Sequence, residues 1–479
     1  MLISFAYTPG TIGPQLQIYA FQFIAQQSGW FITTVEKEAN GYFRWVDGLE
    51  SIGIRQDSGK IVIDVPASRL NQILTRLKCD DTISPDEEPP PIGQPAVDEI
   101  VDEIQKKVID YCIKHQQLYL YKLPWPQGKK MAVALTHDVD MTRKYGLKNL
   151  LKNLGQGHWN DFKDQYRQSV FKENVYWNFD ELLQFYQQKK IRSTFFFLAR
   201  AWENFQYRYQ IRSDKFRRLF ENILAEGHEI GLHSSRYTFS HPDRILREKI
   251  KLEKTISQPV YGVRQHYLRL QFPQAWRNFT AAGFNYDSSC GYNNAVGFRA
   301  GTSGIFHTFD YHDVQINSLQ EIPILLMDYP WSSSFGSEEE SKIIFQRLYQ
   351  DVEKYQGVLN ILWHPSNLAE PAFREAWNNM FKWLKIEDTY LNTLSMIQQW
   401  WNNKSKLNLL NLRTEPTGYG FSLATESDIN HLSLGIISGK KIKPAKDLRQ
   451  LNHGQFQYHL PLIRSGESEY SLSLEEDSR

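Results

Sequence analysis

Two aspartates, Asp138 and Asp140, stand two residues apart in the segment Leu-Thr-His-Asp-Val-Asp. The residues before this segment, Met131–Leu135, are apolar and predict a buried strand. Residues two apart on a strand project to the same side, so we expect both carboxylates to face one space. Two negative charges so close are costly unless a cation or an arginine lies beside them. The pair therefore predicts a catalytic base next to a metal ligand, or else two side chains that cap a turn.

Three further reactive side chains, His233, Arg264 and His364, each follow an apolar run. A histidine can ligate a metal or transfer a proton near neutral pH, and an arginine can hold a carboxylate through two parallel hydrogen bonds. Taken singly, Arg264 could instead be a surface cation over a helix, and His364 a solvated residue before a proline. His228 stands at the start of its run, at the opposite pole, and is expected to be a structural hydrogen-bonding residue.

Seven apolar, strand-like runs alternate with amphipathic helical stretches between residues 128 and 402. The runs are Met131–Leu135, Ser193–Leu198, Glu229–Leu232, Val260–Val263, Phe284–Tyr286, Ile322–Leu326 and Val358–Trp363. Continuous apolar strands that alternate with helices predict parallel strands buried on both faces. We therefore expect an α/β fold with a seven-unit (β/α) barrel of parallel strands, with an open doubly wound sheet as the alternative. The barrel is favoured because the reactive side chains fall at the carboxyl ends of the runs, where barrel enzymes place their catalytic loops.

Two smaller units flank the barrel segment. Residues 1–125 mix helix-like and strand-like stretches and predict a small α+β domain, which contains the acidic, proline-rich linker or loop Asp80–Pro95 and ends in a helix. Residues 405–479 carry short strand-like pieces separated by Gly, Asn and Ser turns. They predict a small all-β domain with a disordered tail.

The composition narrows the class of protein. The 55 basic and 54 acidic residues are spread along the 479-residue chain, which argues against a nucleic-acid partner or an anionic membrane surface. No apolar run reaches about 18 residues, and the N-terminus lacks a basic region, so we expect a cytoplasmic protein without a membrane span. The spacing of Cys79, Cys112 and Cys290 matches neither a disulfide framework nor a zinc finger and fits a reducing compartment.

The order of the reactive segments resembles that of the polysaccharide deacetylase (NodB-homology, carbohydrate esterase 4) family, whose members have a seven-unit barrel. Thr136–Asp140 corresponds to the family motif Thr-Phe-Asp-Asp-Gly, and Gly227–His233 closely matches Gly-His-Glu-Ile-Gly-x-His. Arg264–Tyr267 looks like the arginine that precedes Pro-Pro-Tyr, and His364 looks like the histidine that ends the last motif. The resemblance covers about residues 130–400, and Gly227–His233 is its most specific part.

The resemblance implies a role for each matched residue. Asp138 would be the general base that activates water, Arg264 would orient it, and His364 would protonate the leaving amine. Asp140 and His233 would ligate a divalent metal, with zinc expected. Such a metal lowers the pKa of bound water and stabilises the oxyanion of the intermediate.

Four residues near these motifs are assigned to substrate binding, namely Tyr267, His266, Asp287 and Arg299. Arg299 lies in a loop after the fifth run, where it could bind an anionic group of the substrate. Asp287 and Asp328 each end a run, and either carboxylate could instead hydrogen-bond the imidazole of His364 and raise its pKa. For each aspartate taken singly, capping a turn is the alternative.

Two departures from the family pattern bear on the metal. Val139 stands where the family has its metal aspartate, which comes one residue later here at Asp140. Tyr237 stands where the family has a second histidine, so two ligands match where a catalytic zinc site has three protein ligands. We therefore expect a metal that is absent, weakly held, or completed by Tyr237, His241 or His137.

Together these features predict a hydrolase that removes an N-acyl group, expected to be acetyl, from an amino sugar or glycan. One alternative is a hydrolase of the same barrel type that acts on a non-sugar C–N bond, such as that of a cyclic ureide. A second alternative is a barrel that binds glycans without turnover. The presence of both Asp138 and His364 argues against the latter, because a binding module has no need for a base and an acid.

Overall fold

The computed structural model covers residues 1–479. It describes all of them except 1, 10–11, 34–38, 80–91, 143–154, 156–158, 160–162, 164–174, 200–208, 237, 335–336, 439, 453 and 476–479. Within the described part, no helix combines the length and apolar character that crossing a bilayer requires. The disordered tail expected from the sequence falls partly on residues 476–479, outside this part.

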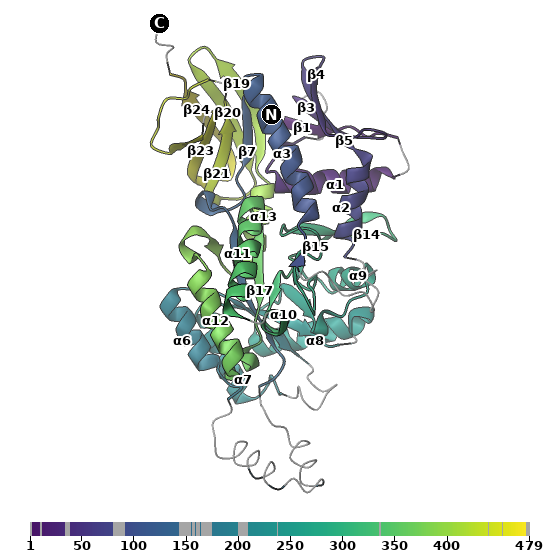
Figure 1. Ribbon diagram of the computed structural model, residues 1–479, viewed down its shortest axis with the longest axis vertical. Helices are drawn as coiled ribbons and strands as arrows, with labels where there is room; N and C mark the ends of the chain where they lie inside the picture. Colours follow the sequence, from purple (N-terminus) through teal and green to yellow (C-terminus); the bar gives the residue numbers. More distant parts are fainter. Residues whose placement is uncertain are drawn as a thin grey trace.

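The N-terminal unit is a five-stranded sheet with three helices beside it (Figure 1). Its elements are β1 (Leu2–Phe5), α1 (Pro14–Gln27), β2 (Phe31–Ile32), β3 (Gly41–Val46), β4 (Gly53–Asp57), β5 (Lys60–Pro66), α2 (Ala67–Leu77) and α3 (Ala96–Lys114). The strand order is β2-β1-β3-β5-β4, and every neighbouring pair is parallel except β4 with β5.

The central sheet carries the predicted strand–helix alternation. Its strands are β8 (Ala132–Val139), β9 (Thr194–Leu198), β10 (Glu229–Ser234), β11 (Gly262–Gln265), β12 (Tyr286–Asp287), β14 (Phe306–Asp310), β15 (Gln315–Glu321), β16 (Leu326–Met327), β17 (Val358–Leu362) and β18 (Tyr390–Leu391). The helices are α6 (Phe179–Lys189), α7 (Asp214–Ala225), α8 (Pro242–Ile256), α9 (Gln274–Ala281), α10 (Asp328–Ser334), α11 (Glu338–Tyr355), α12 (Pro371–Trp383) and α13 (Leu394–Ser405). A two-residue pair, β6 (Ile92–Gly93) with β13 (Val296–Gly297), lies outside this sheet.

Local sequence accounts for these elements. All eight residues of β8 are buried, as expected for a parallel strand covered on both faces. Helix α7 buries Phe216, Leu219, Phe220 and Ile223, which recur at the spacing of one helical face. Helix α11 begins after Ser337, whose hydroxyl accepts a hydrogen bond from the backbone N–H of Glu340.

The order of the central strands is β14-β15-β12-β11-β10-β9-β8-β17-β16, with β18 beside β8. All neighbours are parallel except β14 with β15. The α/β class is therefore confirmed. The strand ladder has two ends, so closure into a barrel is not confirmed. Between these ends, the Ile322 N–H donates to Asp287 O at 3.0 Å and the Leu325 N–H donates to Asn360 O at 3.0 Å.

The C-terminal unit consists of two antiparallel sheets. One has the order β19 (Asn408–Glu415), β20 (Gly418–Thr425), β24 (Gly466–Ser473). The other has the order β22 (Leu448–Asn452), β23 (Gln455–Ile463), β21 (Ile429–Ile437), β7 (Tyr119–Lys122). Strand β7 precedes the central sheet in the sequence yet pairs with β21, so this C-terminal sheet combines strands from before and after the central sheet.

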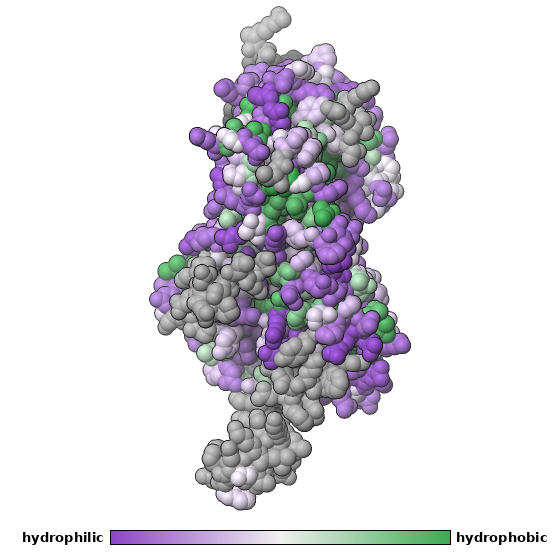
Figure 2. Space-filling view, turned by 90° about the vertical axis from the view of Figure 1, so that its right-hand side faces the viewer, coloured by the Kyte–Doolittle hydropathy of each residue, from purple (hydrophilic) through white to green (hydrophobic). Residues whose placement is uncertain are grey.

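The N-terminal and C-terminal units lie side by side at one end of the molecule, with the central sheet and its helices at the other (Figure 1). One apolar cluster joins Ala132, Phe196 and Val358 of the central sheet to Trp401 and Leu434. The face shown in Figure 2 is mainly hydrophilic, with hydrophobic residues gathered in its upper half. Since the cluster covers one end of the central strands, a site on this sheet belongs at their carboxyl ends.

The cysteines differ from the expectation. Cys79, after α2, forms a disulfide with Cys290, after β12, and Cys112 is a buried free thiol. The inference that the spacing holds no disulfide framework was wrong on this pair. The two partners are 211 residues apart, so only the packing of the N-terminal unit on the central unit brings them together.

Candidate active site

Six reactive side chains meet at the carboxyl ends of the central strands. Asp138 lies on β8 and Asp140 directly after it; His233 lies on β10, Arg264 on β11, His266 directly after β11, and His364 two residues after β17. All six are largely withdrawn from solvent; His364 and Asp140 keep the most exposed side chains, at 19% and 15%. Residues up to 226 positions apart in the sequence are thus placed in one buried cluster.

Three of these residues present atoms suited to hold one metal ion. Oδ1 of Asp140 lies 3.2 Å from Nε2 of His233 and 3.3 Å from Nε2 of His266. One ligand atom from each residue can be chosen so that all lie within 4.8 Å of one another. Two atoms bonded to the same tetrahedral zinc ion at about 2.0–2.1 Å are about 3.3 Å apart. The spacing and the two-nitrogen, one-oxygen donor set therefore fit a catalytic zinc or a similar divalent ion.

The hydrogen bonds around these atoms agree with metal binding. Nδ1 of His233 lies 2.9 Å from the backbone oxygen of Arg264, and since that oxygen can only accept, Nδ1 carries the hydrogen. Neutral His233 then turns the lone pair of Nε2 toward Asp140, an arrangement that needs a cation or a proton between them. Oδ1 of Asp140 is buried and makes no hydrogen bond within the described part of the chain.

The charges in the cluster reinforce one another. Burial raises the pKa of Asp140, but the imidazoles of His266 and His233 outweigh burial and hold that pKa well below its usual value. Burial lowers the pKa of His233, but the charge of Asp138 and the carboxylate of Asp140 raise it overall. The site therefore favours an ionised Asp140 next to positive charge, whether a proton or a metal supplies it.

His266 is the ligand candidate that the sequence reasoning placed in a different role. It was expected to bind substrate, but its Nε2 faces Asp140, and its ring stacks on that of Tyr267 with centroids 4.1 Å apart. The family pattern offered no signal for a histidine at this position. The spacing did offer one, because His266 follows Arg264 by the same two residues that separate Asp138 from Asp140.

Asp138 is held by Arg264, as the sequence predicted. Nη1 of Arg264 donates to Oδ1 of Asp138 at 3.0 Å and to the hydroxyl of Thr136 at 2.8 Å. Nε and Nη2 donate instead to the backbone oxygen and the hydroxyl of Ser288, at 2.7 and 2.8 Å. Arg264 therefore makes one hydrogen bond to the carboxylate instead of the expected two. The other oxygen of Asp138, Oδ2, lies 3.7 Å from Nε2 of His233.

His364 is paired with Asp328, one of its two predicted partners. Nδ1 of His364 lies 2.9 Å from Oδ1 of Asp328, whose Oδ2 accepts hydrogen bonds from the His364 N–H and from Nδ2 of Asn367. Burial lowers the pKa of His364, but the charge and hydrogen bond of Asp328, together with Asp140 and Asp138, raise it to about 10. Nε2 of His364 therefore carries a proton and lies 3.7 Å from Oδ2 of Asp140.

The three residues considered as a further metal ligand have different outcomes. His137 points to the other side of β8, where Nδ1 donates to Trp363 O at 2.8 Å and Nε2 accepts from the Tyr186 hydroxyl at 2.6 Å. Burial lowers its pKa to about 3, so it is neutral. His241 precedes α8 and contacts the hydroxyl of Ser240. Tyr237 lies outside the described residues.

The other predicted residues lie apart from the metal ligands. Asp287 contacts the hydroxyl of Ser289 and the indole of Trp276, and burial raises its pKa to about 6. Neither a substrate contact nor a bond to His364 is therefore assigned to it. Arg299 donates to Gly291 O at 2.8 Å, and its guanidinium lies 5.9 Å from the centre of the Phe272 ring.

Tyr267 lies exposed beside the cluster, and His228 lies away from it. Tyr267 is 40% exposed, stacks on His266 and has a positive φ of 62°, which is uncommon for a residue with a side chain and occurs at functional sites. His228 is buried at the opposite pole, where Nδ1 accepts from the backbone N–H of Ser193 at 3.0 Å.

The central unit is similar to known proteins both in sequence and in structure. Residues 170–292 match the family model for polysaccharide deacetylase. This part of the central unit is similar to the polysaccharide deacetylase family. The resemblance inferred from the motifs is thereby confirmed, and the matched residues include His233 and His266. No curated protein matches the chain.

Several solved structures are similar to the polysaccharide deacetylase unit at low identity. The Puue allantoinase is 14% identical with a TM-score of 0.41, over 59% of this chain and 93% of that chain. A probable polysaccharide deacetylase from Pseudomonas aeruginosa PAO1 is also 14% identical with a TM-score of 0.41, over 59% and 94%. The chitin deacetylase from Colletotrichum lindemuthianum is 11% identical with a TM-score of 0.32, over 58% and 89%.

Proposed function

We propose that this chain is a metal-dependent hydrolase that removes an N-acetyl group from an amino sugar or glycan. The observation that carries the proposal is the meeting of three kinds of group in one buried cluster. These are a metal-ligand set, a carboxylate held by an arginine, and a histidine held protonated by a second carboxylate. A hydrolysis of an amide needs these three functions together, because water must be activated, the oxyanion stabilised and the amine protonated.

Asp140, His233 and His266 would hold the divalent metal, which would supply the positive charge that activates water and stabilises the oxyanion. Three protein ligands leave a coordination position open, as in catalytic zinc sites generally. This assignment replaces the two-ligand site expected from the motifs, with His266 in the place left by the family's second histidine.

The protein side chains supply the proton transfers. Asp138 accepts a proton from the attacking water through Oδ2, while Arg264 holds Oδ1 and keeps the carboxylate in place. The water oxygen then bonds to the amide carbon. His364 donates its Nε2 proton to the amide nitrogen, the C–N bond breaks, and acetate and a free amine are the products. Asp328 orients His364 and stabilises its charged form until the proton is transferred.

Two further inferences complete the proposal. The bonds of Ile322 to Asp287 on β12 and of Leu325 to Asn360 on β17 support a seven-unit barrel, with the segment from β15 to β16 closing it. The exposure of Tyr267 beside His266 supports a contact with the substrate. We also propose that the chain divides into domains at residues 1–125, 128–402 and 405–479, with β7 of the first segment paired to the sheet of the last.

The test is acetate release from oligomers of N-acetylglucosamine by zinc-supplemented protein. Asp138→Asn keeps the size of the side chain but removes the base, and we expect a loss of at least about 100-fold. His241→Ala, at the exposed start of α8, is the matched control and should keep full activity. Equal release by wild type and Asp138→Asn would refute the assigned base. Release of ammonia or a ring-opened product from a cyclic ureide, with none from the oligomers, would favour the non-sugar C–N hydrolase instead.

A further inference from the structure

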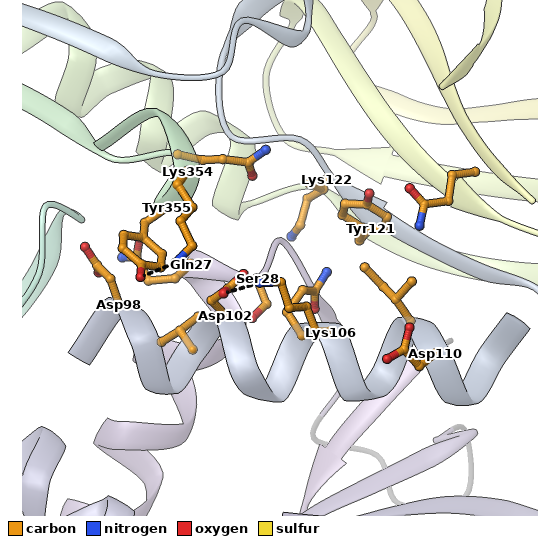
Figure 3. A pocket seen from close by; sticks show the side chains of 15 residues that line it. Gln27, Ser28, Asp98, Asp102, Lys106, Asp110, Tyr121, Lys122, Lys354 and Tyr355 are labelled. Carbon is orange, nitrogen blue, oxygen red and sulfur yellow. Dashed lines mark hydrogen bonds and ion pairs between the residues drawn. The ribbon is translucent and has the colours of Figure 1, made fainter. Parts of the chain in front are cut away.

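A pocket of about 310 Å³ lies at the junction of the three units, away from the candidate active site (Figure 3). The end of α1, one face of α3, β7, the end of α11 and one residue of β23 form its walls. Lys354, Tyr355 and Gln356 line one side and directly precede β17, whose first residue is Val358. The pocket therefore lies near the amino-terminal ends of the central strands, whereas Asp138 lies at their carboxyl ends.

The inner wall of the pocket carries a buried amine. Lys122 on β7 is 6% exposed, and its Nζ donates to Leu407 O at 3.3 Å, near the ring of Phe31. No ion pair to Lys122 exists among the described residues. Lys404 is a second buried amine, and its like charge lies close enough to act on Lys122. Burial lowers the pKa of Lys122 to about 7, as expected for an amine without a counter-charge.

A buried hydroxyl, that of Ser28, lines the same pocket as this amine. Ser28 ends α1 and is 6% exposed, and its Oγ makes no hydrogen bond within the described part of the chain. Gly29, the next residue, accepts the backbone N–H of Lys122 at 2.7 Å, so the two side chains come from adjoining segments. Figure 3 shows the amine end of Lys122 directed from β7 toward α3, on the side where Ser28 lies. The pocket thus contains a hydroxyl that makes no hydrogen bond within the described residues and an ammonium group whose one bond given above, to Leu407 O, leaves donors to spare.

The acidic residues of the pocket are already engaged or exposed. Asp98 accepts hydrogen bonds from the N–H and hydroxyl of Ser303 at 2.8 and 2.9 Å. Asp102 pairs with Lys106 at 2.7 Å. Asp110 is exposed at the outer end of α3's pocket face. These acidic residues therefore leave room for a ligand with a negatively charged hydrogen-bond acceptor at Lys122 and Ser28.

We propose that this pocket binds a small hydroxylated molecule with one anionic group, a carboxylate or a phosphate, which pairs with Lys122 and Ser28. The volume is at the lower end for small-molecule sites, which favours a ligand about the size of a monosaccharide. Glutamine side chains and the hydroxyl groups of Tyr121 and Tyr355 line the remainder, and such groups bind sugar hydroxyls. The class is therefore a sugar acid or a sugar phosphate.

The test is calorimetric titration of the full chain at constant ionic strength with glucuronate, glucose 6-phosphate and neutral glucose. We expect one or both anionic sugars to bind at least tenfold more tightly than glucose. Lys122→Met keeps the apolar stem but removes a charge-assisted hydrogen bond to the ligand, so it should weaken binding at least about tenfold. Ser28→Ala should weaken it by a smaller factor. Lys354→Met is the control, because Lys354 lines the pocket but its Nζ already contacts the hydroxyl of Tyr355 at 2.6 Å.

The two anionic probes distinguish a carboxylate site from a phosphate site. Failure of both to bind would overturn the proposal, as would binding that Lys122→Met and Lys354→Met affect equally. Glucose binding as tight as that of the anionic sugars would also overturn it. The measurement does not use catalysis, and a sugar held at the candidate active site would bind Lys122→Met as it binds wild type. The outcome is therefore independent of the proposed deacetylase activity.

Discussion

Replacing His266 with alanine tests the metal site directly. Zinc binds to structural sites of four protein ligands with a free energy of about 10–16 kcal/mol, so one ligand contributes about 2.5–4 kcal/mol. Nε2 of His266 lies 3.3 Å from Oδ1 of Asp140, which is the separation expected of two atoms bonded to one zinc ion, so we treat His266 as a full metal ligand in this prediction. His266→Ala should therefore weaken zinc binding by about 70- to 900-fold.

The assay is competition for zinc against a fluorescent chelator at constant pH, with circular dichroism to verify that each variant is folded. Tyr237→Phe and His241→Ala are the informative controls, since the sequence alone left both as candidates for the missing ligand. Both should bind zinc as tightly as wild type. If His266→Ala binds zinc normally while Tyr237→Phe loses it, the ligand set of Asp140, His233 and His266 is wrong.

Three further outcomes follow from the contacts. Ser288→Ala removes the hydroxyl that accepts from Arg264, so kcat for acetate release should fall about tenfold, whereas Ser289→Ala, which touches no atom of that guanidinium, should change kcat little. Burial raises the pKa of Asp98 to about 6, so the folded state gains stability from the protonated carboxyl below about pH 4 and loses it as the pH rises through about 6. In urea unfolding between pH 4 and 8, the free energy of unfolding of wild type should fall by about 3 kcal/mol relative to that of Asp98→Asn. Cys79→Ser opens a loop of 211 residues and should lower the free energy of unfolding by about 2–5 kcal/mol, while non-reducing peptide mapping of wild type should show the linked pair.

The parts of the fold that repeat along the sequence could be predicted. All seven apolar runs lie on or beside strands of the central sheet, because a strand buried on both faces leaves a continuous apolar signature. Contacts between segments that are far apart in the sequence could not be predicted. The joining of β7 to β21 and the bond between Cys79 and Cys290 link segments hundreds of residues apart, and no local pattern specifies such partners.

The candidate site, too, could be predicted from the sequence only in part. Asp138, Asp140, His233, Arg264 and His364 could be placed together, because carboxyl ends of parallel strands share one edge. The partner of His364 could be narrowed only to two aspartates, since choosing between them needs the distance from each strand end to the imidazole. Arg299 was assigned on its loop position alone, and a loop position does not specify where a long side chain points.

The register of the strands explains why His266 can replace a ligand that the family pattern places elsewhere. His233 on β10 pairs with Arg264 on β11, so the two strands reach the site at the same level. Arg264 binds Asp138, and one step of two residues further along both chains, His266 reaches Asp140. Asp138 thus meets Arg264 at one level and Asp140 meets His266 at the next, while Nε2 of His233 lies between them, 3.7 Å from Oδ2 of Asp138 and 3.2 Å from Oδ1 of Asp140. The place of His266 two residues beyond Arg264 is therefore what brings its imidazole to Asp140, and it supports the proposal of His266 as the third ligand.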